Sequence, residues 1–172
     1  YLNLKGNQIS DVSPLAGLTN LVTLYLENNQ ISDVSPLAGL TNLEDLALYN
    51  NQISDLSPLA GLTDLDYLYL NNNQISDLSP LAGLTDLGIL ALYQNRITDI
   101  SALVANNGIG FDDEVYLQDN LLDLSEGSKA MTDIRTLISR GVSVRYLPEA
   151  SVAVLAIVAF TVMMVAARPR CT

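Results

Sequence analysis

The chain contains no histidine and no tryptophan, and its only cysteine, Cys171, is the penultimate residue. Histidine is the side chain that most often acts as a general base near neutral pH. The chain also has no glycine-rich phosphate loop, zinc-ligand spacing or nucleophile elbow. We therefore predict that the protein is not an enzyme and that it needs no metal and no cofactor. A body without cysteine needs no disulfide in any redox compartment.

Basic residues are scarce as well. The net charge of the 172-residue chain is −11, and residues 1–100 hold eleven acidic residues against two basic ones, Lys5 and Arg96. A nucleic-acid-binding protein needs a basic face to neutralise phosphates. The sequence therefore predicts no nucleic-acid partner.

A repeat of 22 residues fills most of the chain. Each copy carries two leucines separated by one residue, then an asparagine and an isoleucine. The copies are Leu24, Leu26, Asn29 and Ile31; Leu46, Leu48, Asn51 and Ile53; Leu68, Leu70, Asn73 and Ile75; and Leu90, Leu92, Asn95 and Ile97. The chain opens inside an earlier copy, at Leu2 and Leu4, so we expect it to be a fragment of a longer protein.

Each position of the repeat has a physical role. Leu24 and Leu26 flank Tyr25, so in a strand their side chains point inward and Tyr25 points outward. We expect Ser35 and Pro36 to be the cap and the first position of a short helical turn, where proline needs no hydrogen-bond donor. One coil cannot bury its apolar face alone, so the copies must stack.

The spacing L-x-x-L-x-L-x-x-N-x-I/L resembles the leucine-rich repeat, and the segment I-S-D-x-S-P-L-A-G-L-T resembles its bacterial internalin-type class. The resemblance covers roughly residues 1–125. It implies an α/β solenoid, or horseshoe, with a parallel β-sheet on the concave face and short 3₁₀ turns on the convex face. It also implies that the protein binds a ligand rather than catalysing a reaction.

Two polar columns recur with the repeat. The resemblance implies that the asparagines are buried and bond to backbone groups; they are Asn7, Asn29, Asn51, Asn73, Asn95 and Asn120. A second column could suggest a calcium ladder, but the glycine-rich nonapeptide of such ladders is missing, so we predict turn bonding. Its members are Asp11, Asp33, Asp55, Asp77 and Asp99.

The repeats extend over residues 1–100, and we predict that residues 101–147 form an atypical repeat and a C-terminal cap. The pattern returns at Val115 after 25 residues instead of 22. Apolar residues at helical spacing predict a helix from Ser125 to Arg140, which Gly141 ends. A last strand is expected from Val142 to Tyr146.

Residues 148–172 form a predicted transmembrane or sorting tail. The eighteen residues from Ala150 to Ala167 carry no charge; as a helix they would span about 27 Å, close to the roughly 30 Å of a bilayer core. Arg168 and Arg170 follow, and by the positive-inside tendency the repeats then lie outside the cytoplasm. We predict a location in the cell envelope.

The tail also resembles a bacterial sorting signal, which has a short motif, an apolar span and a basic end. Pro148 and Glu149 match the exosortase P-E-P motif, where Ala150 replaces the second proline. Leu147 and Pro148 match the sortase motif L-P-x-T-G, where Ala150 and Ser151 replace threonine and glycine. The resemblance implies an exosortase or a sortase as partner. A plain membrane anchor is the alternative.

Seven of the eight tyrosines fall on outward strand positions; only Tyr146 does not. Tyrosine offers a large contact area with few rotatable bonds, and we expect the next column, with Asn28 and Asn50, to add adaptable polar groups. The candidate ligand-binding residues on the concave face are Tyr25, Glu27, Asp45, Tyr49, Tyr67, Tyr69, Asn71, Tyr93 and Tyr116. Alternatively, tyrosine simply suits strands and cross-strand stacking.

The predicted function is a cell-surface or secreted binding module that recognises a protein or a surface glycan through this tyrosine- and asparagine-rich acidic face. The alternative is a structural spacer or envelope component without a dedicated ligand.

Overall fold

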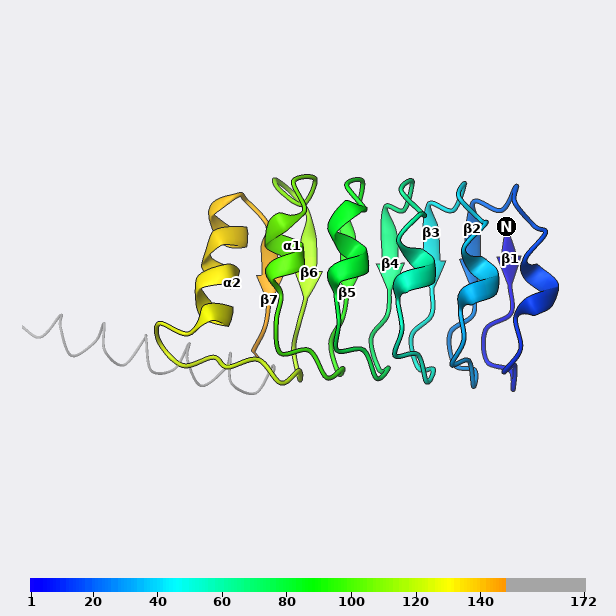
Figure 1. The fold of residues 1–172 in the computed structure, drawn as a ribbon, viewed down its shortest axis with the longest axis horizontal. Coiled ribbons are helices and arrows are strands. Elements are labelled where there is room, and N and C mark those ends of the chain that lie inside the picture. The colour runs from blue at the N-terminus through cyan, green and yellow to red at the C-terminus, as the bar shows by residue number, and fades with distance from the viewer. Residues whose placement is uncertain (148–172) are drawn as a thin grey trace, which may run out of the picture.

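A computed structural model describes residues 1–147 of the chain. Short strands alternate with single helical turns along the chain (Figure 1). The strands of this part are β1 (Leu2–Asn3), β2 (Thr23–Tyr25), β3 (Asp45–Ala47), β4 (Tyr67–Tyr69), β5 (Ile89–Ala91), β6 (Glu114–Tyr116) and β7 (Ser143–Arg145). The 3₁₀ turns are η1 (Ser13–Leu15), η2 (Ser35–Leu37), η3 (Ser57–Leu59) and η4 (Ser79–Gly83), and the helices are α1 (Ser101–Ala105) and α2 (Lys129–Ser139).

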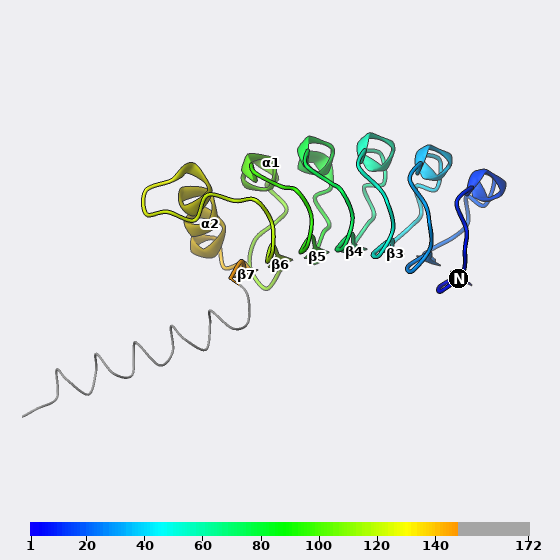
Figure 2. The same cartoon turned by 90° about the horizontal axis from the view of Figure 1, so that it is seen from below.

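All strands of the described residues join one parallel sheet in the order β1 to β7. Leu24 pairs with Leu46 and Leu46 with Leu68, so neighbouring strands are offset by one full repeat. The strands line the inner side of a curved stack and the helical turns line its outer side (Figure 2). The predicted solenoid, with its parallel sheet and 3₁₀ turns, is confirmed.

The core is a continuous file of leucine and isoleucine side chains between the sheet and the turns. Leu24, Leu26, Ile31, Leu37 and Leu40 are completely buried, and the equivalent residues of the next two coils are too. This confirms the predicted inward positions. Each coil adds a single layer of side chains to the core, so the burial of these side chains depends on the coils before and after it.

The aspartate column bonds within the turns, as predicted. Asp33 Oδ1 accepts a hydrogen bond of 2.8 Å from the backbone N–H of Ser35, and the aspartates of the other repeats do the same to the serine two residues on. The expectation that Ser35 caps the turn is wrong. Ser35 is the first residue of η2, its side chain makes no capping bond, and Asp33 satisfies its N–H instead.

The asparagine column ties each coil to the one before it. Asn51 Nδ2 donates to the carbonyls of Leu26 in the preceding coil (3.1 Å) and Leu48 in its own coil (3.0 Å). Its Oδ1 accepts from the N–H of Ile31 at 2.9 Å. The same pattern recurs at Asn29, Asn73, Asn95 and Asn120. The expected burial is confirmed only for Asn95, whereas Asn29, Asn51, Asn73 and Asn120 are half-buried. Asn7, in the first coil, is exposed, contrary to the expectation, and donates only to carbonyls of its own coil.

The coil after β5 departs from the repeat in a way that the sequence did not reveal. Asn106 occupies the place of a core leucine such as Leu84 and is fully buried. Its Nδ2 donates to the carbonyls of Leu81 and Leu84, at 3.0 and 2.7 Å, and its Oδ1 accepts from Gly108 N–H. A side chain at position 108 would collide with the carbonyl of Thr85, so glycine is required there.

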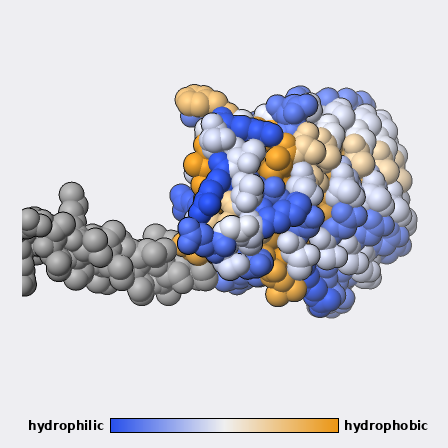
Figure 3. Space-filling model, turned by 60° about the vertical axis from the view of Figure 1, so that its left-hand side comes forward, coloured by the Kyte–Doolittle hydropathy of each residue, from blue (hydrophilic) through white to orange (hydrophobic). Residues whose placement is uncertain are grey.

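Helix α2 and strand β7 close the C-terminal end of the described stack. The helix begins at Lys129, not at Ser125 as predicted, because Gly127 takes a left-handed φ of +80° and Ser128 then caps the N-terminus by accepting from Met131 N–H. Gly141, with φ +94°, follows the C-terminal end as predicted. Figure 3 shows this end as a mosaic of hydrophilic and hydrophobic patches.

The predicted tail, including the motif residues Pro148 and Glu149 and the apolar run, lies outside the described residues. Between residues 1 and 147, no helix has both the length and the apolar character needed to cross a membrane.

Loss of one asparagine amide should destabilise the stack more than loss of one turn carboxylate. Asn51→Ala removes the amide that donates to the carbonyls of Leu26 and Leu48 and accepts from the N–H of Ile31. Because these backbone groups lose a partner, the free energy of unfolding should fall by about 1–3 kcal/mol. Asp55→Ala removes bonds to exposed Ser57 and should cost less. Urea denaturation of both variants measures the two losses. A larger loss in Asp55→Ala than in Asn51→Ala would show that the asparagine amide does not hold neighbouring coils together.

Candidate functional site

The concave face consists of the outward side chains of the sheet, and they form three columns across the strands. The pairing register gives the first two columns. The first column is Thr23, Asp45, Tyr67, Ile89, Glu114 and Ser143. The second is Tyr25, Ala47, Tyr69, Ala91, Tyr116 and Arg145. The third, two residues further along each chain segment, is Lys5, Glu27, Tyr49, Asn71, Tyr93 and Gln118.

The tyrosines of the second and third columns alternate from strand to strand. Tyr25 and Tyr69 stand in the second column, with Ala47 between them on β3; Tyr49 stands beside Ala47 in the third column. Ala47 is 4% exposed and Ala91, the next alanine of the column, is 5% exposed. Each alanine leaves a space that its neighbouring tyrosines surround.

Two adjoining hollows result. The acidic hollow, of about 250 Å³, is lined by Tyr25, Glu27, Asp45, Ala47, Tyr49 and Tyr69. The tyrosine hollow, of about 400 Å³, is lined by Tyr49, Tyr69, Asn71, Ile89, Ala91, Tyr93 and Tyr116. Both share Tyr49 and Tyr69.

The structure brings eight of the nine predicted ligand-binding residues into these two hollows. Tyr67 lines neither and stands in the first column, 39% exposed. Glu27 and Asn71 are less accessible than their outward positions imply, at 4% and 3% exposure. The predicted residues therefore form one continuous surface, in which tyrosines supply the accessible area and Glu27 and Asn71 lie deep.

A hydrogen bond joins two residues of the acidic hollow. The hydroxyl of Tyr25 donates to Asp45 Oδ2 at 2.6 Å. This bond, together with burial, raises the pKa of Tyr25 from 10.0 to about 12. Burial, followed by the charge of Asp45, raises the pKa of Tyr69 as well. At the other end of the face, a hydrogen bond to Glu114 raises the pKa of Tyr116.

The column with Asn28 and Asn50 has a structural role that sequence reasoning missed. Asn28, Asn50, Asn72, Gln94 and Asp119 all take a left-handed φ of 55–57°. Asparagine adopts this conformation more readily than most residues. The signal was present in the sequence, because the first coil has glycine, Gly6, at this position, with φ +69°. The turn accounts for these residue types without any ligand.

Within the described part of the chain, no group of three or more carboxylate or cysteine side chains could hold a metal ion. The hollows offer acceptors and aromatic rings, and this chemistry suits binding.

Comparison with known proteins agrees with the geometry. A family model described as leucine-rich repeats (2 copies) matches residues 1–39, 19–61, 41–83 and 63–105, which together cover more than half of the chain. The chain belongs to the leucine-rich repeat family. No match was found among curated proteins.

Among solved structures, this leucine-rich repeat protein is similar to internalins of Listeria monocytogenes. Internalin C2 is 42% identical, with a TM-score of 0.72 over 86% of this chain and 60% of that one. The internalin InlF is 38% identical, with a TM-score of 0.71 over 84% of this chain and 41% of that one. The chain thus spans about half the length of these internalins. The internalin-type resemblance of the repeats is confirmed.

A more distant match shows the fold alone. The leucine-rich repeat ectodomain of the Arabidopsis thaliana receptor kinase GASSHO1/SCHENGEN3, solved in complex with Casparian strip integrity factor 2, is 21% identical. Its TM-score is 0.56 over 66% of this chain and 14% of that one.

The Tyr25–Asp45 bond predicts an alkaline titration. The proton of Tyr25 is held more tightly in the folded state, so its stabilising effect is complete below pH 10 and is lost as the pH rises through about 12. Asp45→Asn should lower the pKa of Tyr25 toward 10, because the charged acceptor is gone. NMR titration of the tyrosine ring carbons measures this pKa. Glu44→Gln, which removes an adjacent carboxylate not bonded to Tyr25, is the control and should leave it unchanged.

Proposed function

We propose that this leucine-rich repeat protein is a binding module that recognises a protein partner through its concave face. The observation that carries the proposal is the convergence of Tyr25, Tyr49, Tyr69, Tyr93 and Tyr116 on two hollows that share a wall. Interfaces concentrate their energy in aromatic anchors seated in pockets. Solenoids offer such surfaces on their concave side.

Rigidity supports this function. The face is built on strands, and every strand from β2 to β6 is bonded on both sides. Tyrosine has only two side-chain torsions and loses little conformational freedom on binding. A surface of this kind is ordered before the partner arrives, which reduces the entropy cost of association. A spacer without a ligand has no need of this order.

We further propose that the module works at the outer side of a bacterial membrane, held or sorted there by residues 148–172. The charge-free run from Ala150 to Ala167 and the basic residues after it support this location. The proposal includes two forms of the tail. One is a retained membrane anchor, and the other is a signal that an exosortase or a sortase processes at Pro148–Ser151.

The tyrosines should dominate the affinity for the partner. Tyr49→Ser together with Tyr69→Ser, at the two tyrosines that both hollows share, should weaken binding strongly, because each aromatic hot spot contributes about 2 kcal/mol or more. Tyr146→Ser, at the one tyrosine off the concave face, should leave affinity unchanged. The measurement is capture of surface proteins from the native host by the full chain, followed by titration of the captured protein. Equal losses in both variants, or a captured glycan in place of a protein, would contradict the proposal.

The mass of the mature protein should show which of the two forms the tail takes. A retained anchor should keep the intact chain in the membrane fraction until detergent releases it. A processed signal should give a mature protein that ends near Pro148–Ser151 and lacks Arg168, and changing Pro148 and Glu149 to Ala should then block maturation. Mass spectrometry of the C-terminus in the native host separates these results. A full-length chain that is freely soluble and monomeric without detergent would contradict both forms.

A further inference from the structure

The acidic hollow contains two carboxylates that retain buried oxygens without a donor. Glu27 Oε1 lies 3.3 Å from the ammonium of Lys5, but Glu27 Oε2 is buried and no described residue donates to it. Asp45 Oδ2 accepts from Tyr25, whereas Asp45 Oδ1 is also buried and without a donor among residues 1–147. A buried acceptor without a partner is costly, most of all on a charged group.

The walls of the hollow suit a cation. Tyr25, Tyr49 and Tyr69 line the hollow together with the two carboxylates. A tyrosine ring attracts a cation placed over its face, and the attraction grows when water is displaced. The volume of about 250 Å³ is several times the ~30 Å³ that one water occupies in the liquid. The head group of a long side chain therefore has room.

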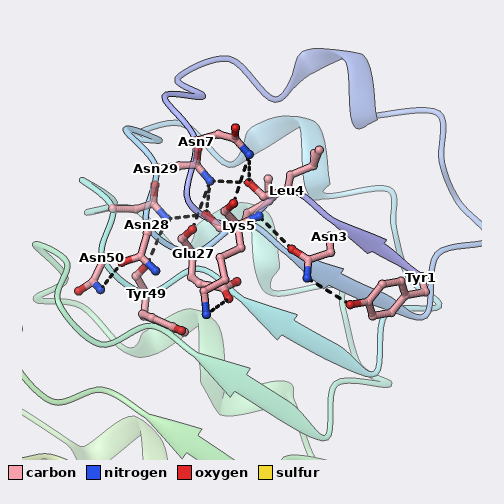
Figure 4. A network of polar contacts seen from close by, with 12 residues as sticks. Tyr1, Asn3, Leu4, Lys5, Asn7, Glu27, Asn28, Asn29, Tyr49 and Asn50 are labelled. Carbon is pink, nitrogen blue, oxygen red and sulfur yellow. Dashed lines mark hydrogen bonds and ion pairs between the residues drawn. The ribbon is translucent and has the colours of Figure 1, made fainter.

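The concave face already binds cations of the chain itself at both ends. At the β1 end, the Lys5 side chain extends to Glu27 (Figure 4), and Glu27 followed by the Tyr49 hydroxyl raises the pKa of Lys5. At the β7 end, the guanidinium carbon of Arg145 lies 5.3 Å from the centre of the Tyr116 ring. Both modes, a carboxylate partner and an aromatic side chain, are available in the acidic hollow, which Glu27 itself lines.

We propose that the acidic hollow binds a basic side chain, arginine or lysine, which the protein partner inserts between Glu27 and Asp45. This proposal rests on the proposed function and names the anchor that the partner must carry. Arginine fits best, because its planar guanidinium has five donors for two carboxylates and stacks on aromatic rings. The position of Lys5 makes it an internal competitor for Glu27, so its removal strengthens binding of the partner's cation.

Short peptides test whether the acidic hollow binds a basic side chain without the need for the unidentified partner. The probes are acetylated, amidated peptides of four arginines, four lysines or four citrullines; citrulline has the shape of arginine without its charge. Binding to the full chain in mild detergent is measured by calorimetry and by NMR shifts of the tyrosine rings. The arginine peptide should bind and shift Tyr25, Tyr49 and Tyr69, the lysine peptide should bind more weakly, and the citrulline peptide should not bind.

Matched variants separate the hollow from the general negative charge. Glu27→Gln with Asp45→Asn should weaken arginine-peptide binding by about tenfold or more, since bonds to charged groups are lost. Asp64→Asn with Asp86→Asn removes as many charges at exposed positions where earlier repeats have Asn20 and Asn42. This control pair should change affinity by less than about twofold, because exposed charges are screened by salt.

A second pair of variants keeps the test valid if the carboxylate variant folds poorly. Lys5→Met frees Glu27 and should strengthen arginine-peptide binding several-fold. Arg96→Gln also removes one exposed positive charge, at a position where the other repeats have glutamine, and should have little effect. The proposal would be overturned if Glu27→Gln with Asp45→Asn changed the affinity for the arginine peptide no more than Asp64→Asn with Asp86→Asn. It would also be overturned if Lys5→Met had the same effect as Arg96→Gln, or if the citrulline peptide bound.

The experiments also distinguish failure of the basic-anchor proposal from failure of the proposed binding face. If the Tyr49 and Tyr69 variants abolish capture of the native partner while Glu27→Gln with Asp45→Asn does not, the binding face stands and the basic-anchor proposal is overturned. If the tyrosine variants capture the partner normally, the concave face itself is excluded, whatever the peptides show.

Discussion

One asparagine amide per coil, using its donors and its acceptor, is the interaction on which the stack depends. Asn51 bonds to Leu26, Ile31 and Leu48, so it holds the bend of its own coil and fixes the preceding coil at the same time. The leucines supply most of the burial, and the amide adds hydrogen bonds that fit the observed pairing register. That register places the outward side chains of the concave face.

Features that repeat were readable from the sequence, because each copy confirms the others. The inward leucines, the asparagine ladder and the aspartate–serine turns all follow from residue type and spacing. The eight predicted residues in the hollows were found from outward register together with residue type, since an outward strand position stays outward in every coil. Because the same residue type recurs at the same position of each coil, a structural preference that is weak in one copy becomes a strong prediction for all copies.

Some features that occur once were not readable. Glu27 is buried and pairs with Lys5 of the preceding coil, and Asn106 is buried and donates to carbonyls 22 and 25 residues away. The start of α2 depends on the backbone of Gly127. In each case the deciding contact lies outside the repeat pattern, so neither spacing nor composition indicates it. These departures from the repeat are also where the chain gains its acidic hollow and its closed end.

The alternation of tyrosine and alanine along the second column gives the face a longer period than the chain. The backbone repeats with every coil, but Tyr25, Tyr69 and Tyr116 recur only with every second coil. At the usual strand spacing this is a period of roughly 9.5 Å. Loss of a single coil that carries alanine would leave the fold intact yet put two tyrosines side by side and close a hollow, and loss of a tyrosine coil would put two alanines side by side. A change of two coils would preserve the pattern, so the unit in which this surface can grow or shrink is the pair.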